Sequence, residues 1–127
     1  MDRTNINATD APQPVGGYCQ AIKLTDAKEL LLISGQIPVR PDGTLPETFA
    51  EQAAQTWANL DAQLRAAGTS REDLVKVTIF LGSREHIPEY RAARQAYLGD
   101  HTVGLTCIVT GIFDEAWLLE IEAVAAR

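Results

Sequence analysis

The sequence lacks the features that would place a protein in a membrane or on a nucleic acid. Its longest nearly apolar run, Leu30 to Ile33, is far shorter than the ~20 residues that a helix needs to cross a bilayer. Basic residues are few, and 11 of them against 17 acidic ones give a net charge of −6. Nucleic acids and anionic membrane surfaces are normally bound by a basic face, so neither is an expected partner. The first seven residues contain no apolar signal-peptide core, which predicts a cytoplasmic location.

Cysteine and recognisable cofactor motifs are also scarce. Cys19 and Cys107 have no metal-ligand spacing, and in a cytosolic protein we expect two free, buried thiols rather than a disulfide. His86 and His101 have no acidic or cysteine companion at ligand spacing, so we expect no metal. A phosphate-binding glycine loop, a nucleophile elbow and a dinucleotide fingerprint are all missing.

What remains is the composition of an ordinary globular protein. With 46% hydrophobic and 22% charged residues in a chain of 127, the sequence predicts one domain that spans residues 1–127. A capping-box pattern at Thr48 and Glu51 and a stop at Gly68 mark the clearest helix. The other expected elements are a β-hairpin of residues 18–24 and 29–34, a strand at 74–81, a helix at 84–98, and strands at 104–110 and 117–125.

This order of elements, β-β-α-β-α-β-β, predicts an α+β fold. One mixed sheet would have both helices on one face. Its other face still carries apolar residues, and an uncovered apolar face usually needs a partner. We therefore expect an oligomer.

Two groups near the ends of the chain could carry chemistry. Glu120 and Glu122 share one face of the last strand, with Cα atoms ~6.6 Å apart, and a paired carboxylate can serve as a general acid or base. The alternative is an ordinary solvated strand face. Tyr18 follows two glycines and could donate a hydrogen bond to a ligand, or it could simply pack on its strand.

Arginines on the second helix and a mid-strand cysteine are weaker candidates. Arg91 and Arg94 lie on successive helical turns, where one could bind a carboxylate through its planar guanidinium or both could be solvated. Cys107 has no neighbouring base or cation in the sequence that would activate it, which favours an inert thiol.

Residues 34–38 read Ser-Gly-Gln-Ile-Pro, and four further motifs lie at 17–21, 55–68, 74–81 and 119–123. In this order the five motifs resemble those of the RidA/YjgF family of small trimeric proteins, and residues 34–38 match a motif of that family completely. The resemblance covers about residues 12 to 125.

The resemblance implies a chorismate-mutase-like fold, in which three sheets pack together as a homotrimer. Ligands would bind in clefts between neighbouring subunits. Active members of the family hydrolyse reactive enamines and imines to a keto acid and ammonia, and they use no cofactor or metal.

Residue by residue, the resemblance implies that the catalytic glutamate is Glu120 and that the tyrosine of the pocket is Tyr18. The glutamate is thought to position water or to shuttle a proton. The implied substrate-binding residues are Ser34, Gly35, Arg91, Leu105, Thr106 and Cys107.

One implied position departs from the family pattern, because Leu105 stands where the family has the arginine that binds the substrate carboxylate. Leucine cannot replace that contact, and an unpaired buried carboxylate costs several kcal/mol. Either Arg91 supplies the missing cation, or the substrate has no carboxylate and Leu105 forms an apolar wall.

Two functions follow from this departure. The first is a divergent imine or enamine hydrolase with an altered substrate. The second is a non-catalytic trimer that binds a small molecule, such as a metabolite sensor or a pathway accessory. Ribonuclease activity, a label attached to some members of the family, fits poorly with the net charge of −6.

Overall fold

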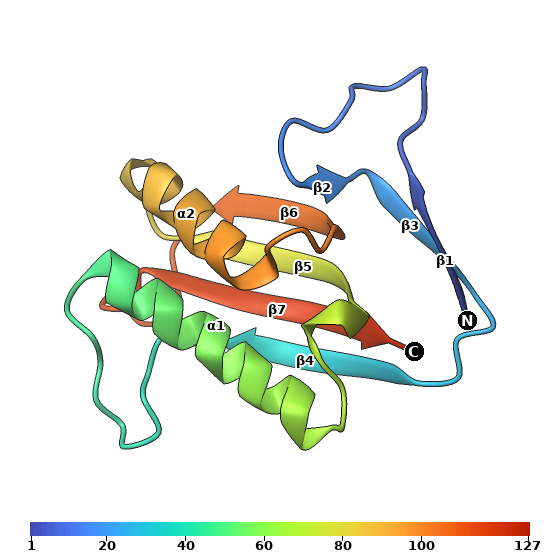
Figure 1. The fold of residues 1–127 in the computed structure, drawn as a ribbon. Helices are drawn as coiled ribbons and strands as arrows, with labels where there is room; N and C mark the ends of the chain where they lie inside the picture. Colours follow the sequence, from blue (N-terminus) through green and yellow to red (C-terminus); the bar gives the residue numbers. More distant parts are fainter.

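A computed structural model describes all residues from 1 to 127, with two helices and seven strands (Figure 1). The helices are α1 (Phe49–Ala66) and α2 (Ile87–Leu98). The strands are β1 (Asp2–Ile6), β2 (Tyr18–Cys19), β3 (Ala21–Thr25), β4 (Leu30–Gln36), β5 (Leu74–Leu81), β6 (Val103–Val109) and β7 (Leu119–Ala126).

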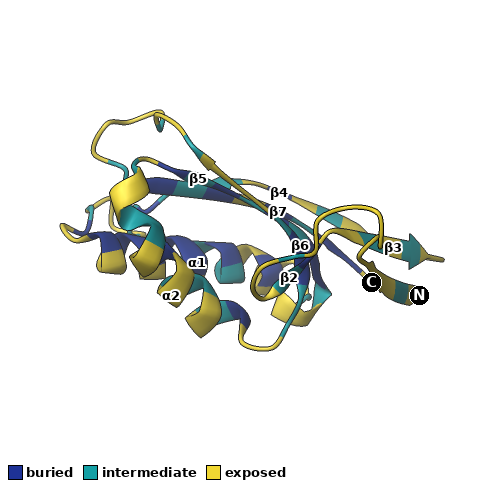
Figure 2. Ribbon diagram, turned by 90° about the horizontal axis from the view of Figure 1, so that it is seen from above, coloured by how far each residue is buried: buried dark blue, intermediate teal, exposed yellow.

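Five of the strands form one mixed sheet in the order β2-β6-β5-β7-β4. Strands β2 and β5 both run parallel to β6, whereas β7 is antiparallel to β5 and to β4. Both helices cover the same face of this sheet (Figure 2). The α+β architecture that the sequence predicts is therefore confirmed.

Helix α1 begins and ends where its sequence signals lie. The Thr48 side chain accepts a hydrogen bond from the backbone N–H of Glu51 at 3.2 Å, which satisfies one of the free donors of the first turn. Just beyond the helix, Gly68 has a φ of +74°, a backbone conformation that side chains disfavour. Apolar side chains at helical spacing face the sheet, and Leu60 and Leu64 are fully buried there.

The second predicted helix, 84–98, divides into a short 3₁₀ turn (Arg84–His86) and α2. Pro88 lies in the first turn of α2, where its missing N–H costs nothing. The Ser83 hydroxyl accepts a hydrogen bond from the backbone N–H of Glu85 at 3.3 Å and so caps the 3₁₀ turn.

The predicted hairpin of residues 18–24 and 29–34 is wrong for this chain. Tyr18 and Cys19, at its start, lie at the opposite edge of the sheet from β4, because they pair in parallel with Val103 and Gly104 of β6. Strand β3 instead forms a separate two-stranded ribbon with β1, which has no counterpart in the predicted order of elements. Figure 1 shows this ribbon beyond one end of the sheet. We call residues 1–25 the N-terminal arm.

Arg3 attaches the N-terminal arm to the sheet. Its guanidinium donates hydrogen bonds to the carbonyl of Leu74, at 2.8 Å, and to that of Thr102. His101 also lies 2.9 Å from the Leu74 carbonyl, through its Nε2 atom. These contacts connect β1 to the ends of β5 and β6. They stabilise the position of the arm at the β2 edge of the sheet, at a distance from β4.

The sheet face opposite the helices, which we call the open face, is covered by no helix (Figure 2). Side chains alternate along β5 and β7, so Val77 and Ile121 enter the core, whereas Thr78 and Glu122 lie on the open face. Leu32 of β4 is 75% exposed there. The face that the sequence predicts to be uncovered is thus present.

Neither α1 nor α2 combines the length and the apolar character that a membrane-spanning helix needs.

Candidate functional site

A cavity of about 360 Å³ lies between α2 and β6, with the N-terminal arm at its side. It is lined by side chains from three elements that are distant in the sequence. Those with polar or reactive groups, together with the leucine that departs from the family pattern, are Tyr18, Tyr90, Arg91, Arg94, Leu105 and Cys107.

The periodicity of each element explains this convergence. Residues three or four apart share one face of a helix, which brings Arg91 and Arg94 of α2 to the same cavity. Leu105 and Cys107 are two apart in β6, so both side chains point to the helix side of the sheet. Tyr18 joins them because β2 pairs alongside β6.

The cavity is cationic on its α2 side. Arg94 donates a hydrogen bond through Nη1 to the Tyr90 hydroxyl at 2.9 Å, and its guanidinium carbon lies 5.4 Å from the centre of the Tyr90 ring. Arg91 forms no salt bridge and no side-chain hydrogen bond within the chain. A free guanidinium beside an apolar wall can bind a carboxylate through two parallel hydrogen bonds.

The Cys107 thiol borders this cationic side. Burial raises the pKa of the thiol, while the Tyr90 hydroxyl and the guanidinium groups of Arg94 and Arg91 act in the opposite direction. Cys107 is nevertheless an exposed residue, so the expectation of a buried thiol is wrong here, although it holds for Cys19, which is 2% exposed. Both cysteines are free thiols, as predicted.

The predicted catalytic glutamate lies outside this cavity. Glu120 belongs to β7, and its carboxylate lies against Gly35 of β4, where a Cβ atom would overlap with it. Glycine at position 35 therefore leaves the room that the Glu120 side chain occupies. As predicted, Glu120 and Glu122 lie on the same face of their strand, because the strand period is two.

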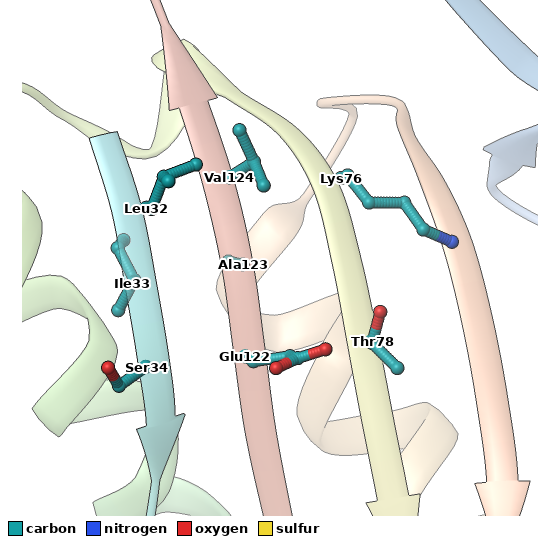
Figure 3. Close-up of a pocket in the computed structure, with 8 residues that line it drawn as sticks. All are labelled: Leu32, Ile33, Ser34, Lys76, Thr78, Glu122, Ala123 and Val124. Atoms are coloured by element: carbon teal, nitrogen blue, oxygen red, sulfur yellow. The ribbon is translucent and has the colours of Figure 1, made fainter. Parts of the chain in front are cut away.

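A second hollow of about 300 Å³ lies on the open face (Figure 3). It is lined by Ser34 of β4, Glu122 of β7, and Lys76 and Thr78 of β5. Figure 3 shows Glu122 extending from β7 toward Thr78. Thr106 is also on this face, since its hydroxyl is 2.6 Å from the Lys76 ammonium.

Within one chain, the predicted site residues thus fall into two groups. The cavity brings together Tyr18, Arg91, Leu105 and Cys107. The other four lie on the open face or where β7 meets β4, and they are Ser34, Gly35, Thr106 and Glu120.

Two polar residues of the cavity, Tyr90 and Arg94, were absent from the predicted site. Arg94 was identified as a candidate through its spacing from Arg91, but no family motif carried it into the site. Tyr90 gave no signal, because an aromatic residue on a helix facing a sheet is typical of a core.

The family comparison matches nearly the whole chain. Residues 8–127 match the model of the family described as Endoribonuclease L-PSP. A RutC family protein of Aquifex aeolicus is 36% identical over 118 residues, which cover 92% of each chain. The 2-iminobutanoate/2-iminopropanoate deaminase of Escherichia coli K12 is 32% identical, over 100% of this chain and 99% of its own.

Solved structures share the fold over almost their full length. The Rid-family protein YyfB of Yersinia pestis has a TM-score of 0.83 at 25% identity, with 100% of both chains covered. Escherichia coli TdcF, solved with bound serine, has a TM-score of 0.74 at 29% identity, with 98% of each chain covered. The chain belongs to the Endoribonuclease L-PSP family, which is the RidA/YjgF family that its motifs resemble.

Proposed function

We propose that this protein hydrolyses a reactive imine or enamine to a carbonyl compound and ammonia. The observation that carries the proposal is the cavity beside β6, where Tyr18 and the unpaired Arg91 lie together in a chain of this family. A relative that matches the whole chain is named for the deamination of two imino acids. The proposed working unit is a cytoplasmic homotrimer, with one domain in each chain.

The reaction needs a base for water and a proton donor for nitrogen. Water adds to the C=N carbon and gives up a proton, the nitrogen gains protons, and the C–N bond then breaks to release ammonia and leave a C=O group. We assign the activation of water to Glu120 and the hydrogen bond to the substrate to the Tyr18 hydroxyl. Positioned carboxylates typically accelerate such proton transfers by ~10²–10⁴-fold.

In the proposed trimer, Glu120 of one subunit would meet the cavity of a neighbouring subunit in the cleft between them. Apolar side chains exposed on the open face support its burial against neighbouring subunits, with Leu32 75% and Ile108 44% exposed. Separation of the two groups of site residues within one chain is then expected, since each subunit supplies half of a cleft.

The proposed substrate carries a carboxylate that is bound from α2 instead of from β6. Leu105 removes the cation that the family resemblance implies on β6, and Arg91 and Arg94 line the same cavity. Arg91 has no partner within the chain, so its guanidinium is available to a ligand. This arrangement favours replacement of the missing cation over a substrate without a carboxylate.

Two neighbouring glutamates provide a matched test. Glu120→Gln should lower the rate of ammonia release from a freshly generated imino acid by about 100-fold or more. Glu122→Gln, two residues away on the same strand face, should change the rate by less than about threefold. Full activity of the Glu120→Gln variant would contradict the proposed role of the carboxylate.

Binding without turnover is the second candidate function. The separation of Glu120 from the cavity within one chain favours it, because the cavity alone contains no carboxylate that could act as a base. Calorimetric titration with a stable keto acid, combined with the absence of ammonia release from any imine, would support this alternative.

A further inference from the structure

We propose that copies of this protein exchange their N-terminal arms, so that β3 of one chain pairs with β4 of a second copy. The strands with an unpaired edge include β3 and β4. Strand β3 pairs only with β1, and β4 pairs only with β7. An unpaired edge presents a row of free N–H and C=O groups that readily pair with another chain.

The chain's own β4 is out of reach of β3 in this arrangement. The arm is held at the β2 edge of the sheet, and β6, β5 and β7 lie between that edge and β4. Arg3 fixes the arm there through the carbonyls of Leu74 and Thr102. A partner for the free edge of β4 must therefore come from another copy.

The segment that connects β3 to β4 is also held away from a hairpin turn. The backbone N–H groups of Lys28 and Glu29 each donate a hydrogen bond to the Arg127 carbonyl at 2.9 Å. In return, the N–H of Arg127 donates to the Glu29 carbonyl at 3.1 Å. Residues 26–29 consequently run along the end of the sheet instead of forming a hairpin turn.

The side-chain patterns of the two free edges are complementary. An antiparallel pairing with Lys23 opposite Leu32 aligns the half-buried Ile22 and Leu24 with Ile33 and Leu31. All four apolar side chains then lie on the helix side of the sheet, while Lys23 and Leu32 lie on the open face. A shift of one residue would reverse this match, so the alternation specifies the register.

The same register would complete the candidate site across two chains. It places Gln20 opposite Gly35 of the partner subunit, and Tyr18 is two residues, or ~7 Å, further along the strand. Gly35 borders Glu120 within each chain. The exchanged arm would thus place Tyr18, together with the cavity of the chain to which it belongs, close to Glu120 of the partner subunit. The exchange itself concerns chain connectivity and does not depend on imine hydrolysis.

Disulfide trapping between differently tagged chains tests the exchange. One chain carries Lys23→Cys and the other Leu32→Cys, both at exposed positions and both in a Cys19→Ala, Cys107→Ala background. The two are co-expressed, oxidised and separated on a non-reducing gel. Exchange predicts a disulfide between the two tagged chains in most of the mixed assemblies.

A control and a double variant make every outcome decisive. Thr4→Cys replaces Lys23→Cys in the control. Thr4 of β1 pairs with Lys23 on the edge of β3 that is already occupied, so a cysteine at position 4 should not reach one at position 32. Lys23→Cys and Leu32→Cys in one chain should give covalent oligomers. A disulfide that closes within the single chain, or no disulfide at all, would overturn the proposal.

Discussion

Replacing Arg3 with methionine is expected to release the N-terminal arm without unfolding the protein. Methionine keeps most of the apolar stem and removes the two hydrogen bonds to the Leu74 and Thr102 carbonyls. Hydrogen bonds from a charged group contribute about 1.5–3 kcal/mol each. The lower value applies here because Arg3 is only partly buried and water can replace the lost donor.

Two such bonds amount to about 3 kcal/mol, which corresponds to roughly 100-fold in the equilibrium for arm opening. Loss of the Leu74 contact is softened because His101 also contacts that carbonyl. Amide hydrogen exchange followed by mass spectrometry should therefore show faster exchange in the peptide that contains β3, by about 10-fold to 100-fold. The peptide of β5 serves as an internal reference and should not change. Equal acceleration in both peptides, or none in β3, would refute this role of Arg3.

Three further variants test the cavity, the Glu120 environment and the core. Gly35→Ala should displace the Glu120 carboxylate and lower ammonia release at least tenfold while the melting temperature changes little, and unchanged activity would argue against that contact. Arg94→Met removes a cation that favours the Cys107 thiolate, so the pKa of the thiol should rise and its alkylation at pH 8 should slow; faster alkylation would contradict the assigned geometry. Leu60→Ala should cost about 3 kcal/mol of unfolding free energy in a urea titration, because Leu60 is fully buried, and a cost below 1 kcal/mol would conflict with that packing.

The sequence predicts well those parts of the fold that depend on neighbouring residues. The start of α1 follows from a side chain and a backbone group three residues apart, Thr48 and Glu51. Strand β5 has the predicted limits, Leu74–Leu81, because its β-branched residues alternate across a strand that is buried on one face.

Strand pairing is less predictable, because it is decided by groups far apart in the chain. Residues 18–24 and 29–34 have suitable patterns for a hairpin, yet Tyr18 and Cys19 pair with β6 instead. Arg3, which stabilises the alternative, carries no local signal, since its partners are backbone carbonyls near residues 74 and 102. The same side-chain pattern serves pairing within a chain and pairing between chains, so periodicity does not distinguish the two.

The sequence proposes the members of the candidate site, and their grouping is harder to predict. Spacing and family motifs point to Glu120, Tyr18 and Arg91 as candidates, but the position of Tyr18 beside β6 depends on the placement of the N-terminal arm. The cationic side of the cavity depends on Arg94 as well, and its contact with Tyr90 requires the helix to be docked on β6.

Ammonia release from an imino acid, compared between the wild-type protein and an Arg91→Met, Arg94→Met double variant, tests the central claim most directly. Arg84→Met provides a control, because Arg84 lies in the 3₁₀ turn before α2 and outside the cavity. The account predicts that the wild-type and control proteins accelerate release well above spontaneous hydrolysis, and that the double variant loses this acceleration for imines that bear a carboxylate. A wild-type protein that leaves the spontaneous rate unchanged would contradict the proposed activity.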